Sequence, residues 1–103
     1  MADPMRIRAA EKDGVVDVKI LVKHDMESGQ RKDAQGALVP AWFIQTLSAQ
    51  VNDKTVFAAE LGTAVSKDPF LNFKFKGAAK GDEIVVSWVD NRGDKRSDKV
   101  KIS

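Results

Sequence analysis

The chain has 103 residues, 43% of them hydrophobic and 31% charged, so we expect one soluble globular domain over residues 1–103. Its 17 Lys and Arg are interspersed with 15 Asp and Glu, which argues against nucleic acid as a partner, because nucleic-acid binders concentrate basic residues on one side. The chain has no Cys and no apolar run long enough to span a membrane, so we expect no disulfide, no thiolate chemistry and no membrane contact.

Apolar and polar residues alternate with a period of two along most of the chain, which predicts β-strands. The apolar sides of the expected strands are Ile7 and Ala9; Val16, Val18, Ile20 and Val22; Phe57, Ala59 and Leu61; Leu71, Phe73 and Phe75; Ile84, Val86 and Trp88; and Val100 and Ile102. Turn sequences such as "NDKT" at 52–55 and "DNRG" at 90–93 separate them. About seven short strands predict an all-β antiparallel sandwich.

The stretch "HDMESGQRKDAQG" at 24–36 contains the only histidine of the chain. By the alternation of the preceding strand, His24 falls at the inward end of that strand or in the turn just beyond it. One histidine without cysteine is too few ligands for zinc or copper, and Arg31 and Lys32 stand where a calcium loop needs acids. We therefore expect no metal, no cofactor and no catalytic residue, and hence no enzyme. Long loops between strands often carry function, which leaves recognition.

The segment "AWFIQTLSAQV" at 41–51 departs from the pattern of the other strands. If Phe43, Leu47, Ala49 and Val51 face inward, the large apolar side chains Trp42 and Ile44 project outward. Such a pair indicates a surface that a partner covers, although scattered exposed apolar residues are also normal.

Four segments carry a resemblance that extends over nearly the whole chain, from about residue 5 to the last strand: "H-MESG-RKD" at 24–33, "PAWFI" at 40–44, "GTAVSKDPFLNFKFKG" at 62–77 and "WVDNRG" at 88–93. In these segments the chain closely resembles the SoxZ family, which supplies one subunit of the sulfur-oxidising SoxYZ carrier complex. The resemblance implies an immunoglobulin-like β-sandwich and a role without chemistry of its own.

The same resemblance implies a heterodimer with SoxY, whose cysteine on a mobile C-terminal arm carries the sulfur intermediates to successive enzymes. It also implies a periplasmic location. The first residues, "MADPMRIRAA", lack the apolar stretch of a signal peptide, so we expect export together with SoxY.

Six residues are candidates for binding SoxY or the docking enzymes: His24, Met26, Arg31, Lys32, Trp42 and Ile44. We expect His24 to form hydrogen bonds across the base of its loop, while Arg31 and Lys32 favour anionic sulfur adducts or an acidic partner surface. Two alternatives remain at this point. In the first, the 24–36 motif only stabilises the end of the sandwich; in the second, the chain is a separate module that binds a small anion or a sugar.

Overall fold

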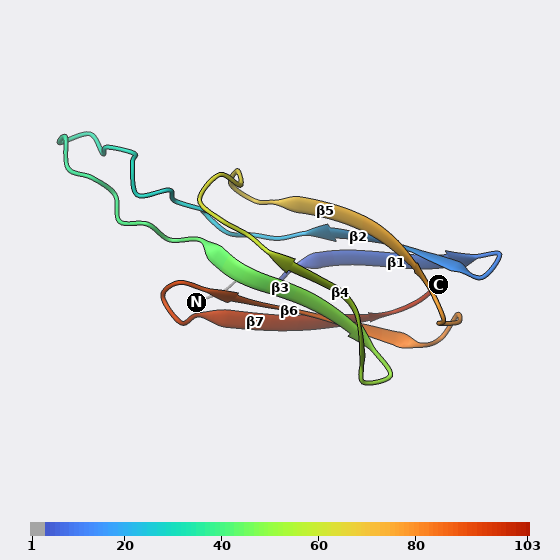
Figure 1. Cartoon of the computed structure of the whole chain (residues 1–103). Coiled ribbons are helices and arrows are strands. Elements are labelled where there is room, and N and C mark those ends of the chain that lie inside the picture. The colour runs from blue at the N-terminus through green and yellow to red at the C-terminus, as the bar shows by residue number, and fades with distance from the viewer. Residues whose placement is uncertain (1–3) are drawn as a thin grey trace.

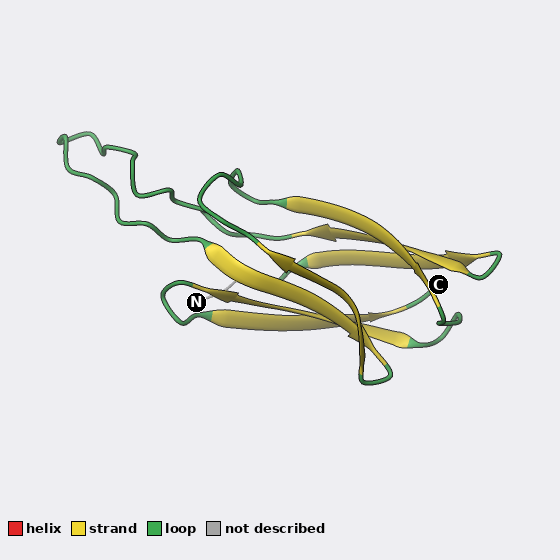
Figure 2. Ribbon diagram, viewed as in Figure 1, coloured by secondary structure: helices red, strands yellow, loops and turns green. Residues whose placement is uncertain are grey.

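The computed structural model describes residues 4–103, and these residues form two antiparallel sheets without a helix (Figures 1 and 2). The seven strands are β1 (Arg6–Lys12), β2 (Val15–Leu21), β3 (Ile44–Val51), β4 (Lys54–Glu60), β5 (Phe70–Lys76), β6 (Glu83–Asp90) and β7 (Lys95–Lys101). The predicted all-β sandwich of about seven strands is confirmed. Since residues 4–103 contain no helix, they contain none that is long and apolar enough to cross a membrane.

One sheet has the strand order β1-β2-β5 and the other has β4-β3-β6-β7. The chain crosses between the sheets after β2, β4 and β5, as in Greek-key sandwiches. The order is that of an immunoglobulin domain in which the fourth strand pairs with the second sheet instead of the first.

The strands form because their apolar residues alternate, so that each buries one row of side chains against the facing sheet. In β2, for example, Val16, Val18 and Ile20 are fully buried, whereas Lys19 between them is exposed. At the open side of the sandwich between β4 and β5, Phe57 and Phe73 stack with ring centroids 4.2 Å apart. The fully or nearly fully buried apolar residues are Met5, Ala9, Val16, Val18, Ile20, Val22, Met26, Ile44, Leu47, Ala49, Val51, Ile84, Val86, Trp88 and Ile102.

The expected outward position of Ile44 is wrong, because Ile44 is fully buried. A β-bulge explains the difference: the pairing of β3 with β6 shifts between Ile44 and Thr46, so Gln45 is an extra residue in β3. Ile44 and Leu47 therefore both face the core although they are three positions apart. Phe43, expected on the inner face, is half-buried and packs against the core.

The segment between β2 and β3 leaves the sandwich as a long projecting arm, residues 22–43 (Figure 1). Its two legs run antiparallel, with β-bridges between Glu27 and Trp42 near the base and between Lys32 and Leu38 near the tip. At the tip, Asp33 accepts hydrogen bonds from the backbone N–H groups of Gln35 and Ala37 through its carboxylate, which closes a turn over "DAQG" at 33–36. The arm makes the molecule long and narrow, with extents of 53 × 21 × 19 Å.

The buried position of Ile44 predicts that Ile44→Ala lowers the free energy of unfolding by about 3 kcal/mol, as expected for truncation of a buried Ile. Thr46→Ala on the exposed side of the same strand is the control, and we expect it to change stability by less than about 0.5 kcal/mol. Urea unfolding of the two variants checks this. Equally small losses of unfolding free energy in the two variants would contradict the buried position and indicate that Ile44 faces outward.

Candidate functional site

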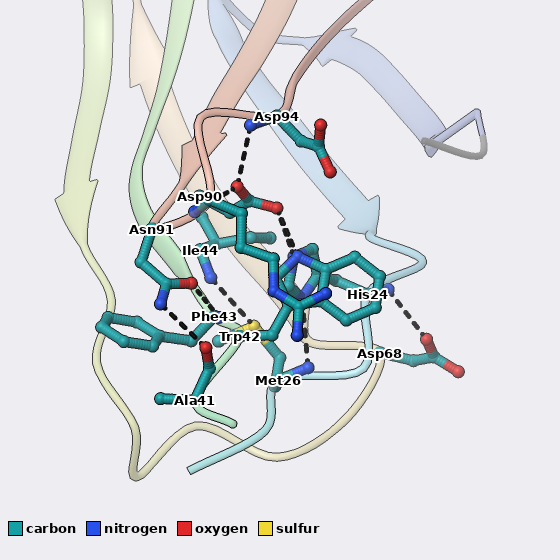
Figure 3. Close-up of polar contacts among 11 residues, drawn as sticks. His24, Met26, Ala41, Trp42, Phe43, Ile44, Asp68, Asp90, Asn91 and Asp94 are labelled. Carbon is teal, nitrogen blue, oxygen red and sulfur yellow. Dashed lines mark hydrogen bonds and ion pairs between the residues drawn. The ribbon is translucent and has the colours of Figure 1, made fainter. Parts of the chain in front are cut away.

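The base of the arm is built around one buried carboxylate, that of Asp90 at the end of β6 (Figure 3). Its Oδ2 atom accepts hydrogen bonds from His24 Nε2 at 3.1 Å and from Trp42 Nε1 at 2.7 Å. Its Oδ1 atom accepts from the backbone N–H groups of Arg92 and Asp94, both at 2.9 Å. Asp90 thus joins both legs of the arm to the turn between β6 and β7.

His24 is positioned by its other ring nitrogen and by its backbone. The N–H of Met26 donates to His24 Nδ1 at 3.1 Å, so Nδ1 is an acceptor and the ring proton lies on Nε2, directed at Asp90. The backbone of His24 exchanges two bonds with Asp68: His24 N–H donates to the Asp68 carboxylate at 3.0 Å, and Asp68 N–H donates to the His24 carbonyl at 2.8 Å. The expected hydrogen bonding of His24 across the loop base is confirmed.

Aromatic contacts complete the base of the arm. The ring of Trp42 lies 4.9 Å from that of His24, and the guanidinium of Arg92 lies 4.5 Å from the centroid of Trp42. The rings of Trp88 and His24 also meet edge-on, with centroids 5.2 Å apart. Trp42 is therefore half-buried with its polar edge turned inward, and the expectation that it projects outward is wrong.

A second clamp holds the leg of the arm that leads into β3. The Asn91 side chain accepts a hydrogen bond from the N–H of Phe43 at 2.8 Å and donates to the carbonyl of Ala41 at 2.9 Å. Asn91 N–H also donates to the Phe43 carbonyl at 3.0 Å. The turn after β6 therefore holds this leg through both Asp90 and Asn91 (Figure 3).

The backbone is strained where the arm begins. Met26 and Asp68 have φ angles of +51° and +52°, in the left-handed region that costs non-glycine residues roughly 1 kcal/mol or more. Met26 is nonetheless buried, and its Sδ atom lies 3.4 Å from the N–H of Ile44, which donates to it. Such conformations persist where the surroundings impose them, as the bonds to His24 do here.

Further along the arm, Arg31 forms a two-pronged ion pair with Glu27, with Arg31 Nη2 2.7 Å from Glu27 Oε1. The hydrogen bond to Arg31 lowers the pKa of Glu27, and the same bond raises the pKa of Arg31. Lys32, one position on, is exposed near the tip. Leu38 opposite it is 60% exposed.

The six candidate residues therefore divide into two groups. His24, Met26 and Ile44 are buried and Trp42 is half-buried, and all four lie together at the base of the arm. Arg31 and Lys32 are exposed on the arm itself. Among residues 4–103, no three side chains of His, Asp or Glu gather as they do around a metal ion.

Sequence reasoning missed Asp90, Asp68 and Asn91. A signal for Asp90 was present, because it shares the inward parity of Ile84, Val86 and Trp88. An inward carboxylate needs a buried donor, and the inward-facing His24 was available. The roles of Asp68 and Asn91 depend on the conformation of loops, and no periodic pattern in the sequence indicates that conformation.

The hydrogen bonds to Asp90 determine how its charge contributes to stability. Burial would raise the pKa of Asp90, but the bonds from His24, Trp42 and the backbone of Arg92 and Asp94 together hold it below the ordinary value. A carboxylate with a depressed pKa stabilises the fold above its unfolded pKa, and this stabilisation is lost as the pH falls through the folded pKa. For Asp90 this stabilisation of the fold is lost as the pH falls below roughly 4.

Asp90→Asn is therefore expected to lower the free energy of unfolding by about 3 kcal/mol near neutral pH, because an amide cannot accept bonds from all four donors. The difference from the unchanged protein should shrink below roughly pH 4, where Asp90 itself takes up a proton. Urea unfolding across this pH range measures it. A difference that stays constant with pH would contradict a charged Asp90 at the base of the arm.

Comparisons with known proteins support one family. The sequence profile of the sulphur oxidation protein SoxZ matches residues 5–101. No curated protein matches the chain. Among solved structures, a hypothetical protein from Pyrococcus horikoshii OT3 is similar with a TM-score of 0.66 and 13% identity, covering 99% of this chain and 88% of that one.

Two variants of superoxide reductase (neelaredoxin) from Archaeoglobus fulgidus are also similar. Their TM-scores are 0.62 and 0.58, each at 18% identity, covering 99% and 97% of this chain and 90% and 86% of theirs. At these identities the likeness shows the fold alone. The family match spans nearly the whole chain and connects it with sulfur oxidation, and the chain is thus a member of the SoxZ family.

Proposed function

We propose that this chain is a non-catalytic subunit of a SoxYZ carrier complex and that the arm, residues 22–43, binds SoxY. The observation that carries the proposal is the arm itself, a long projection whose base is held by the buried Asp90 carboxylate. A rigid base lowers the entropy that the arm loses on binding, which favours a partner that must be held stably.

The Asp90 cluster is suited to support and not to catalysis. Its two carboxylate oxygens accept four hydrogen bonds, and the His24 ring uses both nitrogens within the protein. A general base needs a free lone pair within reach of a substrate, and neither group offers one. The chain has no cysteine, so the thiol that carries sulfur belongs to the partner.

Two of the sequence elements that resemble the family meet at the base of the arm. The element "TAVSKDP" approaches "HDMESG" through the paired bonds of Asp68 and His24. Between them lies a shallow depression lined by Asp25, Met26, Glu27, Ser28, Arg31, Thr63, Ala64, Val65, Ser66 and Lys67. Its cations, Arg31 and Lys67, are matched by the acids Asp25 and Glu27, so the depression has no net charge and offers SoxY polar contacts of both signs.

The six candidate residues have two different roles, according to whether they are exposed on the arm or buried at its base. Arg31 and Lys32 are exposed and can contact the partner directly, whereas His24, Met26 and Ile44 act by fixing the base of the arm. We place the complex in the periplasm, where SoxY brings the chain by shared export.

The proposal predicts that replacing the exposed Leu38 weakens the heterodimer. Leu38→Ser should raise the dissociation constant for SoxY at least about tenfold, in the range of interface truncations, without changing the melting temperature of the isolated chain. Phe70→Ser is a matched control, because Phe70 is 62% exposed but lies on β5 outside the arm. Titration calorimetry of both variants against SoxY measures the effect. An unchanged affinity for Leu38→Ser would contradict binding through the arm, and no complex with SoxY in any variant would contradict the proposed function.

A further inference from the structure

The outward face of the three-stranded sheet β1-β2-β5 is strongly basic. Strand pairing arranges its outward residues in four rows, each read from β1 through β2 to β5. The rows are Arg6, Leu21 and Phe70; Arg8, Lys19 and Asn72; Ala10, Asp17 and Lys74; and Lys12, Val15 and Lys76. We call these twelve residues the basic face. The bases are exposed, and their neighbours of opposite parity, such as Ala9 and Val18, are buried in the core.

Charge is unevenly distributed over the surface of the molecule, although basic and acidic residues are interspersed along the sequence. The basic face holds six of the 17 basic residues and one of the 15 acidic residues, which leaves 11 basic and 14 acidic residues elsewhere. The rest of the chain therefore has a net negative charge. The segregation arises from strand parity, since basic residues occupy outward positions on three strands that are distant in sequence.

The positive charges of the basic face are not neutralised within the part of the chain that the structure describes. None of the six bases forms an ion pair with an acid of residues 4–103. The one acid of the face, Asp17, accepts a hydrogen bond of 2.6 Å from the Asn72 side chain. Arg8 stands directly opposite Lys19, an arrangement that costs stability in a β-sheet. A cost of this kind is expected where the charges serve binding.

The shape of the face fits a protein partner. A shallow depression includes Arg8, Ala10, Asp17 and Lys19 and extends over the edge of the sheet to Lys101, so an acidic side chain can sit among three cations. Phe70, 62% exposed, adds an apolar contact in the row nearest the base of the arm. It is the single aromatic residue of the face, whereas single-stranded nucleic acids require a series of stacking rings.

We propose that the basic face is a transient docking surface for an acidic surface on the sulfur-oxidation enzymes that act on the carrier. This inference rests on the proposed function, and it assigns to the enzymes a surface separate from the arm that binds SoxY. A carrier that visits several enzymes needs fast association and release, and complementary charge accelerates association more than it slows release. The face therefore provides one general contact for several partners.

The test compares two double charge reversals in the assembled complex with SoxY. Arg8→Glu with Lys19→Glu changes the basic face. Lys54→Glu with Lys95→Glu makes the same change in net charge on the other sheet, at exposed positions of β4 and β7. Size-exclusion chromatography with light scattering first establishes that each variant is folded and bound to SoxY. Stopped-flow association with each purified sulfur-oxidation enzyme is then measured at about 50 mM and about 300 mM salt.

We expect the reversal on the basic face to slow association about tenfold or more with at least one enzyme at low salt, and to lose most of this effect at high salt. The control should stay within about twofold of the unchanged complex. Equal effects of both double variants would overturn the proposal, because net charge alone would explain them. The proposal would also be overturned if the unchanged complex bound vesicles of phosphatidylglycerol while the reversal on the basic face left association with every enzyme unaltered.

The two proposals fail in different ways. If the unchanged chain forms no complex with SoxY, the proposed function fails. If the complex forms but Arg8→Glu with Lys19→Glu abolishes it while the control does not, the basic face belongs to the SoxY interface and the docking proposal fails alone.

Discussion

A carboxylate buried at the end of a β-sandwich costs several kcal/mol unless hydrogen bonds compensate for the water that it loses. Asp90 meets this requirement with four donors that come from both legs of the arm and from the turn after β6. Because all of these donors must be present at once, the carboxylate fixes the positions of three chain segments relative to one another. The direction in which the arm leaves the sandwich follows from this constraint.

The same constraint explains why strained residues are tolerated nearby. Met26 and Asp68 adopt left-handed conformations, and each gives a backbone N–H to a hydrogen bond with His24. The free energy of these conformations is offset by the buried bonds that they allow, so the arm is held in one geometry before a partner arrives. In the proposed function, the preformed arm and the separate basic face provide two kinds of contact, the first stable and the second brief.

The periodic part of the structure was predictable from the sequence, and the irregular part was not. Alternation in β2, β5 and β6 identified strands and inward residues correctly, because burial on one face imposes a period of two. The same logic failed at Ile44, where the extra residue Gln45 reverses the faces and leaves no trace in the pattern. The basic face was missed because its members are distant in sequence and come together only through strand pairing.

Hydrogen exchange along the arm, measured in the free chain and in complex with SoxY, tests the central claim that a fixed base presents a binding tip. The account predicts that the Trp42 indole N–H and the Met26 amide, which donate to Asp90 and His24, exchange slowly in both states. Amides between Gly36 and Leu38 at the tip should gain protection only in the complex. Fast exchange at the base of the free chain, or a tip whose exchange does not change on binding, would contradict it.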